Sequence, residues 1–287
     1  MTKIERVELR QVVVQMTAID PVMAIELSAI ASGAAPIEAR EQQLAAAAAS
    51  VASQPTKIAL VGVYGGLSPR GSYYGSSLTD IAAAATRAAN DPDVAGAIVD
   101  VDSPGGTVSG TMEAAAAVAD LASKKPVIAC VNTLAASAAY WIASQASEMV
   151  MSPSGDVGSI GAMIMHHDIS GWLEQIGMKM TLIRSEHAPM KNEAHPFAPL
   201  SDDAKAFLQG RANAAGADFI KAVANGRRVS QTKVREEFGQ GRMVGAREAV
   251  ARGMADRIAT LDQVIGGMLQ QRSPRPHSRR RSALMFD

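Results

Sequence analysis

The feature of this chain that most limits its fold is the alternation of short apolar runs with longer helical patterns. Apolar runs at 57–65, 95–106 and 126–132 have the length of buried strands. Helical patterns at 78–90 and 108–123 lie between them. A helix-length connection joins parallel strands and covers one face of their sheet. The alternation therefore predicts an α/β fold with parallel-sheet β-α-β units.

The pattern continues through the second half of the chain. A helix is expected to start near Ser137, and a long amphipathic helix at 201–225 opens with acidic residues. Two more helix-like segments lie on either side of a last strand and turn at 254–262. The chain thus ends in a largely helical part. Further strands are predicted at 148–152, 158–168 and 179–185.

Composition divides the chain into three parts. Residues 1–55 form an N-terminal arm or linker, since 39–54 is rich in alanine. Residues 56–268 form the main domain. Residues 269–287 form a basic tail, which we expect to be disordered and solvated rather than bound to a polyanion.

Charge and cysteine content exclude several classes of protein. The chain of 287 residues has 28 acidic and 28 basic side chains, so no overall field attracts it to nucleic acid. Its single cysteine, Cys130, excludes an intramolecular disulfide and is expected to be a buried, inert thiol. We expect a cytoplasmic protein without a membrane anchor, because no apolar run is long enough and charges interrupt the N-terminus.

Small and polar residues gather at three of the predicted strand ends. These are "DSPGG" at 102–106, "AAS" at 135–137 and "GSIG" at 158–161. Ligands bind at the carboxyl ends of strands in open α/β sheets. Gly105 and Gly106 can present bare N–H groups to a developing oxyanion. Ser137, flanked by alanines, would open a helix whose dipole favours an alkoxide-like oxygen.

A serine hydroxyl becomes a good nucleophile only when a base removes its proton. Lys191 lies in a largely uncharged segment, and such surroundings favour the burial that keeps a lysine neutral. The residues alone leave a Ser-His and a Ser-Lys site equally open. The candidate bases are His166, His167, His187, His195 and Lys191.

From about Lys57 to Met268 the chain resembles the signal peptide peptidase A (SppA) family of serine proteases, especially its phage capsid (prohead) maturation branch. The resemblance rests on "DVDSPGGTVSG", "NTLAASAAYWIAS", "SPSGDVGSIGAM", "KNEAHPFAPLSDDA" and "VGAREAVARGMADRIATLD" in that order. It implies a ClpP/crotonase-like fold. The chain departs from the family in having Ala138 and Ala139 where Gly-Gly is frequent, and in lacking a glycine shortly before Lys191.

The resemblance also implies roles for individual residues. Ser137 matches the nucleophile, Lys191 the general base, and Ser159 the hydroxyl that holds the lysine amine. Gly106 and Ala138 would supply the oxyanion N–H groups. Four further residues are expected to contact the substrate: Gly105, Thr107, Gly158 and Gly161.

The resulting hypothesis is a serine endopeptidase that cleaves capsid or scaffold proteins in the host cytoplasm or the procapsid interior. It is expected to be a homo-oligomer with no cofactor, no metal and no specific nucleic acid. One alternative is a cytoplasmic peptidase that degrades signal or other peptides. An alternative from another class is a crotonase-fold non-peptidase or an inactive assembly module.

Overall fold

A mostly parallel sheet forms the centre of the molecule, for which the computed structural model describes residues 14–15, 57–73 and 75–270. The sheet follows the order β1-β2-β3-β4-β5-β8, with β6 beside β4 and β7 beside β6. Among the described strands, the β1–β2 and β6–β7 pairs are antiparallel and the other pairs are parallel. The strands are β1 (Val14–Gln15), β2 (Lys57–Leu67), β3 (Val94–Gly106), β4 (Val127–Ala136), β5 (Glu148–Met151), β6 (Asp156–Gly158), β7 (Met243–Gly245) and β8 (Arg257–Ile258).

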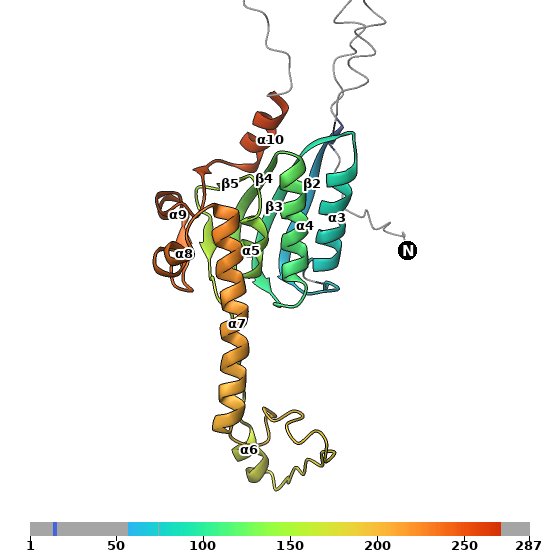
Figure 1. Ribbon diagram of the computed structural model, residues 1–287, viewed down its shortest axis with the longest axis vertical. Helices are drawn as coiled ribbons and strands as arrows, with labels where there is room; N and C mark the ends of the chain where they lie inside the picture. Colours follow the sequence, from blue (N-terminus) through green and yellow to red (C-terminus); the bar gives the residue numbers. More distant parts are fainter. Residues whose placement is uncertain (1–13, 16–56, 74, 271–287) are drawn as a thin grey trace, which may run out of the picture.

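Helices cover both faces of this sheet (Figure 1). α3, α4 and α5 pack on one face, where the larger apolar cluster lies, and α10 lies over the other face with a smaller cluster. The helices are α3 (Leu78–Asn90), α4 (Thr111–Lys124), α5 (Ala138–Ala143), α6 (Ser170–Gln175), α7 (Asp202–Arg227), α8 (Gln231–Glu237), α9 (Ala246–Arg252) and α10 (Leu261–Gln270).

Local sequence explains where these elements begin. The Ser77 hydroxyl accepts a hydrogen bond from the Asp80 N–H at 3.1 Å and so caps α3, which begins at Leu78 as the helical pattern predicts. Ser201 caps α7 in the same way through the Ala204 N–H, with acidic side chains in the first turn. β3 is buried along almost its whole length because helices and neighbouring strands cover it.

The strand register brings the carboxyl ends of several strands together. Gly105 on β3 lies opposite Gly66, and Ser103 lies opposite Ala135 on β4. Ala136 lies opposite Gly158 on β6. The motifs "DSPGG", "AAS" and "GSIG" therefore meet at one edge of the sheet, as the sequence predicts.

The predicted α/β class and parallel sheet are confirmed, whereas two predicted strands are wrong. Residues 158–168 form a strand only at Gly158, where β6 ends, and 179–185 contains no strand. Both segments are apolar enough for strands, but none of the strands in the described residues pairs with them. Three elements that the sequence analysis did not predict are the short strands β1 and β7 and the short helix α6.

The second half of the molecule extends away from the sheet on one long helix. The C-terminal half of α7 packs on the body through Phe219, Val223 and Ala224. Its N-terminal half projects from the body and carries α6 and the irregular segment around it at its far end (Figure 1). The proposed N-terminal arm at 1–55 and tail at 269–287 lie outside the described residues except for β1 and the end of α10.

Candidate active site

Ser137 occupies a sharp turn between β4 and α5. Its backbone has φ 52° and ψ −125°, a conformation that a non-glycine residue rarely adopts. The turn is held from both sides, because the Ser137 N–H donates to the Gly158 carbonyl at 2.8 Å and the Ser137 carbonyl accepts from the Trp141 N–H at 3.0 Å. Such strain costs on the order of 1–3 kcal/mol and persists at functional sites.

The "SPGG" turn approaches this serine so closely that only glycine fits. Gly105 has φ 92°, and a Cβ atom there would lie 2.7 Å from the Ser137 Cβ atom and 2.7 Å from the Ala136 carbonyl oxygen. The buried Ser103 hydroxyl fixes the turn by accepting from the Gly105 N–H at 3.1 Å and donating to the Gly65 carbonyl at 2.6 Å. The ends of β2, β3 and β4 are thereby locked together around Ser137.

A very small pocket, with room for about one water molecule, lies beside the serine. Its lining brings together four residues that the sequence analysis assigned to the site, namely Gly106, Ser137, Ala138 and Gly161. Ala138 is the first residue of α5, so its N–H has no acceptor within the helix and is available to an oxyanion. The remaining lining residues are Val108, Trp141, Ala162, Ala215 and Phe219.

The "GSIG" segment forms another wall of the site. Ser159 has a positive φ of 53°, and its N–H donates to the Arg242 carbonyl at 3.1 Å. Gly158 has φ 126°, and a Cβ atom there would lie 2.5 Å from the same carbonyl oxygen. Ser137 and Ser159 are thus both held in strained backbone conformations beside one another through Gly158.

Thr107 is not among the residues that line the pocket. Its hydroxyl donates to the Ser109 carbonyl at 3.0 Å, and its own carbonyl accepts from the Thr111 hydroxyl at 2.7 Å. These bonds order the loop that leads into α4. Its predicted contact with substrate stays a prediction.

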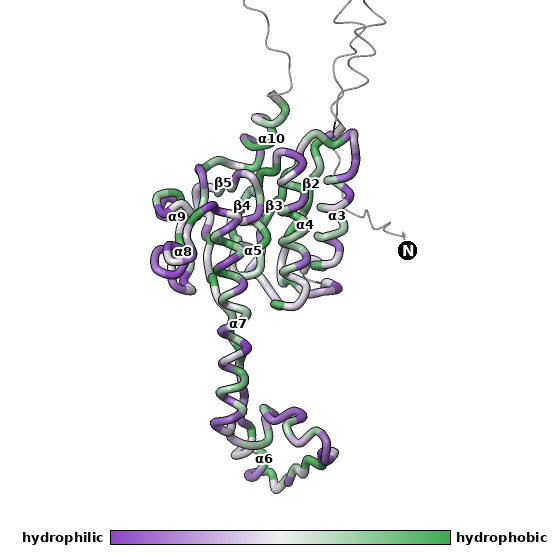
Figure 2. The backbone as a smooth tube through the Cα atoms, viewed as in Figure 1, coloured by the Kyte–Doolittle hydropathy of each residue, from purple (hydrophilic) through white to green (hydrophobic). Residues whose placement is uncertain are grey.

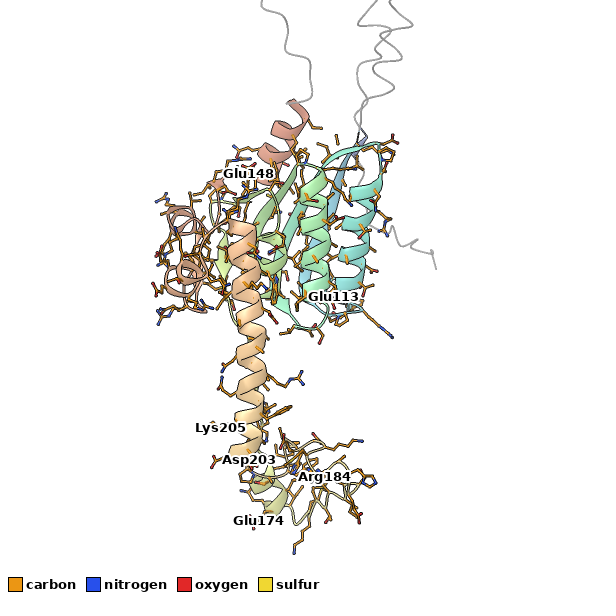
Figure 3. The ribbon with its side chains drawn as sticks, viewed as in Figure 1. Glu113, Glu148, Glu174, Arg184, Asp203 and Lys205 are labelled. Carbon is orange, nitrogen blue, oxygen red and sulfur yellow. The ribbon has the colours of Figure 1, made fainter. Side chains whose placement is uncertain are left out.

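Lys191 lies far from Ser137 in the chain that the structure describes. Its carbonyl accepts a hydrogen bond from the Arg184 guanidinium at 2.6 Å, and Arg184 lies at the far end of α7 (Figure 3). Ala215 of α7 lines the pocket at Ser137, 13 residues beyond the start of the helix at Asp202. At 1.5 Å per residue the end of the helix is about 20 Å from the pocket.

Lys191 is also exposed, although its neighbours in sequence favour burial. The histidines that were the alternative bases belong to the same distal segment, where the His166 ring lies 3.1 Å from the His195 carbonyl oxygen. None of the residues that line the pocket is titratable. The structure therefore brings Ser137, Gly106 and Ala138 together, but in the described part of one chain neither Lys191 nor a histidine lies beside them.

Asp100, a buried acid on β3, lies outside the pocket at Ser137. Asp100 accepts a hydrogen bond from the Tyr64 hydroxyl at 2.6 Å, and it interacts electrostatically with the thiol of Cys130. Burial raises the pKa of the Asp100 carboxyl, and the neighbouring Asp102 raises it further, although the Tyr64 hydroxyl opposes this. Asp100 is not part of the pocket lining, so it does not supply the missing base.

The described residues contain no group of three or more His, Cys, Asp or Glu side chains arranged to hold a metal ion. Within the same part of the chain, every helix is too short or too polar to cross a bilayer.

Comparison with protein-family models matches residues 119–273 to peptidase family S49. The matched region is more than half of the chain and includes Ser137, Ser159 and Lys191. The chain belongs to peptidase family S49. Together with the parallel sheet and its covering helices, this membership confirms the predicted SppA-type resemblance and the ClpP/crotonase-like α/β class.

Several S49 relatives are similar along much of this chain. Capsid assembly protease C of Escherichia phage lambda is 32% identical over 179 residues, which is 62% of this chain and 40% of that protein. Head-tail preconnector protein GP5 of Enterobacteria phage P21 is 34% identical over 174 residues, 61% of this chain and 34% of that protein.

A relative from a plant belongs to the same group. The chloroplastic serine protease SPPA of Arabidopsis thaliana is 31% identical over 171 residues, 59% of this chain and 25% of that protein. The matches therefore span about a quarter to two fifths of the length of these three relatives.

Two pocket residues of this S49 chain escaped the sequence analysis. Trp141 stacks on Phe219 with ring centroids 4.6 Å apart, and the pair forms one apolar wall. Trp141 lies one helical turn after Ser137, so its spacing was a usable signal. Phe219 comes from a distant helix, and no local pattern could have placed it there.

Proposed function

We propose that this S49 protein is a serine endopeptidase that uses Ser137 as nucleophile and Lys191 as general base. The observation that carries the proposal is the strained Ser137 turn, which places this serine in the lining of a pocket beside Ala138, the first residue of α5. A backbone strained in this way, at the edge of a sheet where ligands bind, favours catalysis over a purely structural role.

The proposed chemistry is acyl transfer in two steps. Lys191 has first to be brought to Ser137 from about 20 Å away. Its neutral amine then takes the proton of the Ser137 hydroxyl while Oγ attacks the peptide carbonyl carbon. The N–H groups of Gly106 and Ala138 stabilise the oxyanion, and the ammonium then gives its proton to the leaving amine. Water hydrolyses the acyl-enzyme by the same route. Ser159 would hold the lysine amine through its hydroxyl.

The pocket supports a preference for small or apolar side chains on the substrate. Val108, Trp141 and Phe219 line it with apolar surface. Gly106 and Gly161 leave backbone exposed for an extended peptide, which can bind by adding a strand beside an open sheet edge. A charged side chain in this pocket would lose its hydration without gaining a partner.

We further propose that the substrates are capsid or scaffold proteins. Two of the relatives carry capsid or head-tail names, and this supports a role in prohead maturation. We expect portal and major capsid genes next to the gene for this chain. We also expect the purified enzyme to cleave the major capsid protein that the neighbouring gene encodes. Absence of both would favour the alternative, a peptidase that degrades signal or other peptides.

The test of the nucleophile is labelling with a fluorophosphonate probe and cleavage of fluorescent casein. Ser137→Ala should abolish labelling and reduce cleavage by at least about 10³-fold while the protein stays folded. Ser123→Ala, at an exposed serine of α4, is the matched control and should be as active as wild type. A Ser137→Ala variant with more than about a tenth of wild-type activity would place the nucleophile elsewhere.

Substitution of the base distinguishes lysine from histidine. Lys191→Arg should be nearly as inactive as Lys191→Ala, because a guanidinium does not release its proton at working pH. Glutamine at His166 or His195 should cause only a modest loss. An active Lys191→Ala variant together with an inactive histidine variant would replace the Ser-Lys site by a Ser-His site.

The alternative from another class makes a different prediction. A crotonase-fold non-peptidase or an inactive assembly module has no need of an activated serine, so the wild-type protein would not react with the fluorophosphonate. An inactive module would still assemble. Failure of the wild-type protein to label would therefore overturn the peptidase proposal as a whole.

A further inference from the structure

In the step that leads to the nucleophile turn, β4 contains more residues than its neighbour β3. Val101 of β3 lies opposite Val131 of β4, and the next pair in register is Ser103 with Ala135. Asp102 alone therefore spans on β3 the same step that three residues span on β4. The two extra residues form a β-bulge, which bends a strand locally and changes its register.

This bulge decides which residue of β3 the nucleophile meets. If the register at Val101 continued unchanged, Gly105 would lie opposite Ala135, and Ser137 would lie two residues further on, at about 6.6 Å along the strand. In the observed register Ser103 lies opposite Ala135, which brings Gly105 level with Ser137. Because side chains alternate with a period of two, a shift of two residues leaves every core side chain on its own face. The bulge therefore positions the site without affecting which side chains are buried.

The bulge contains a strained residue. Thr133 has φ 103°, and a β-branched side chain at such a value is an outlier. Nearby on β3 the chain has a glycine, Gly105, at the similar φ of 92°. A strained backbone persists only where surrounding contacts hold it in place. The conformation of the bulge therefore depends on a contact that fixes Thr133.

Asp102 supplies that contact from the opposite strand. The Thr133 hydroxyl donates a hydrogen bond to the Asp102 Oδ1 atom at 3.0 Å. Asp102 is the residue of β3 that faces the bulge, so the bond crosses the irregular step directly. Within the described part of the chain, Thr133 is the one hydrogen-bond partner of this carboxylate. A bond to a carboxylate is about twice as strong as one between neutral groups.

The charge of Asp102 does not serve the stability of β3. Asp100 lies two residues earlier on the same face of the strand and is 6% exposed. Burial raises the pKa of the Asp100 carboxyl, and the negative charge of Asp102 raises it further. Figure 2 shows hydrophobic stretches on the tube of the body, where these strands lie. A second carboxylate beside a buried one is unfavourable in such surroundings, so its contact with Thr133 better explains its place.

The bulge also lies where β4 changes its other partner. β4 pairs with β5 as far as Val131 and with β6 from Leu134 onward. The turn between β5 and β6 packs against the bulge, since a Cβ atom at Gly155 would lie 3.4 Å from the Thr133 carbonyl oxygen. The conformation of Thr133 thus affects both strands whose ends surround Ser137.

We infer that Asp102 is a positioning residue for the nucleophile, because its carboxylate holds Thr133 in the bulge that places Ser137 against the "SPGG" turn. This inference rests on the proposed function of Ser137 and adds the pair of side chains that sets its position. Asp102 and Thr133 do not line the pocket, so they act through the backbone of β4.

Removal of the carboxylate tests the inference through the rate of fluorophosphonate labelling. Asp102→Ala should label on the order of 10²-fold more slowly than wild type, the loss expected for a displacement of about 1 Å. Asp102→Asn keeps an acceptor for the Thr133 hydroxyl, about half as strong, and should label at an intermediate rate. Asp120→Ala is the matched control, since Asp120 is an exposed acid of α4 that accepts one side-chain hydrogen bond, from Lys124 at 2.7 Å. It should label at the wild-type rate.

A second substitution distinguishes positioning from a general loss of stability. Glycine adopts a positive φ without strain, so Thr133→Gly removes the need for the hydrogen bond. The double variant Asp102→Ala/Thr133→Gly should therefore label faster than Asp102→Ala and recover most of the wild-type rate. Two independent losses would instead add, and the double variant would be the slower one. A double variant that labels no faster than Asp102→Ala would refute the inference.

A crystal structure of Asp102→Ala tests the position of Ser137 without any activity. Ser137 should move relative to Gly105 by at least about 0.5 Å, the tolerance of a catalytic arrangement. An unmoved Ser137 with Thr133 still at its positive φ would overturn the inference. If wild type does not label, the proposed function fails, and this structure still decides the inference. If Asp102→Ala does not fold, the double variant must fold with Ser137 in place, and an unfolded double variant would count against positioning.

Discussion

Gly105→Ala is the substitution whose consequence can be worked out most directly from the structure. The new methyl group would lie 2.7 Å from the Ser137 Cβ atom, 2.7 Å from the Ala136 carbonyl oxygen and 3.0 Å from the Ala138 nitrogen. None of these atoms is the flexible end of a side chain. The β4–α5 turn must therefore move by several tenths of an ångström, and the residue would still be held at φ 92°.

Two contributions lower the free energy of unfolding of the Gly105→Ala variant. A non-glycine residue at positive φ costs about 1–2 kcal/mol, and overpacking a tight site costs about 1–3 kcal/mol. The expected loss of unfolding free energy is therefore about 2–5 kcal/mol, out of about 5–15 kcal/mol for a typical domain. For a domain of this size, 1 kcal/mol corresponds to about 2–4 °C, so Tm should fall by about 4–20 °C.

Activity should fall further than stability. The atoms that the methyl group displaces belong to the nucleophile turn and the proposed oxyanion N–H, and a displacement approaching 1 Å in such a site costs on the order of 10²-fold. The assay is calorimetric unfolding together with the rate of fluorophosphonate labelling at 25 °C, where the variant is still folded.

The matched control is Gly267→Ala in α10. A Cβ atom there meets nothing within 4 Å, and the backbone is helical. Alanine in a helix interior should stabilise the protein by about 0.5–1 kcal/mol and leave labelling unchanged. A Gly105→Ala protein that melts within about 2 °C of wild type and labels at the wild-type rate would refute the close approach of the two turns.

Two further predictions concern single buried or ion-paired groups. Burial raises the pKa of the Cys130 thiol to about 11, so the folded protein at pH 8 should not react with a disulfide reagent such as DTNB. The protein unfolded in guanidinium should show one reactive thiol. Fast reaction of the folded protein would contradict the burial of Cys130. Burial alone would raise the pKa of Asp256, but hydrogen bonds from Arg227 and the Met149 N–H outweigh it and lower that pKa. The Asp256 carboxylate therefore contributes stability above its unfolded pKa of about 3.9, and this contribution is lost as pH falls through the lower folded pKa. Urea unfolding of Asp256→Asn should show a loss of about 1 kcal/mol at pH 7 and a smaller one at pH 3, since the side chain is partly exposed; an equal loss at both values would contradict the ion pair.

Local sequence determined much of the body of this molecule. Apolar runs of strand length alternate with capped helices. Each run is buried because the helices of the β-α-β connections cover the faces of the sheet. The Ser77 cap fixes the start of α3, and Gly105 fixes the turn beside Ser137, because only glycine allows that φ and that contact. These features depend on near neighbours in the chain, and for that reason the fold class and the meeting of the three strand-end motifs could be predicted.

The tertiary structure decided what depends on distant partners. Residues 158–168 and 179–185 have the composition of strands, but a strand forms only where another strand accepts its hydrogen bonds, and no strand in the described part of the chain does so there. Phe219 reaches the pocket because α7 packs on α5. Lys191 has the right neighbours in sequence for a base, yet its distance from Ser137 is set by α7, which is rigid and about 39 Å long. Composition and spacing specify which groups a site needs, whereas helix length and packing specify which of them can meet.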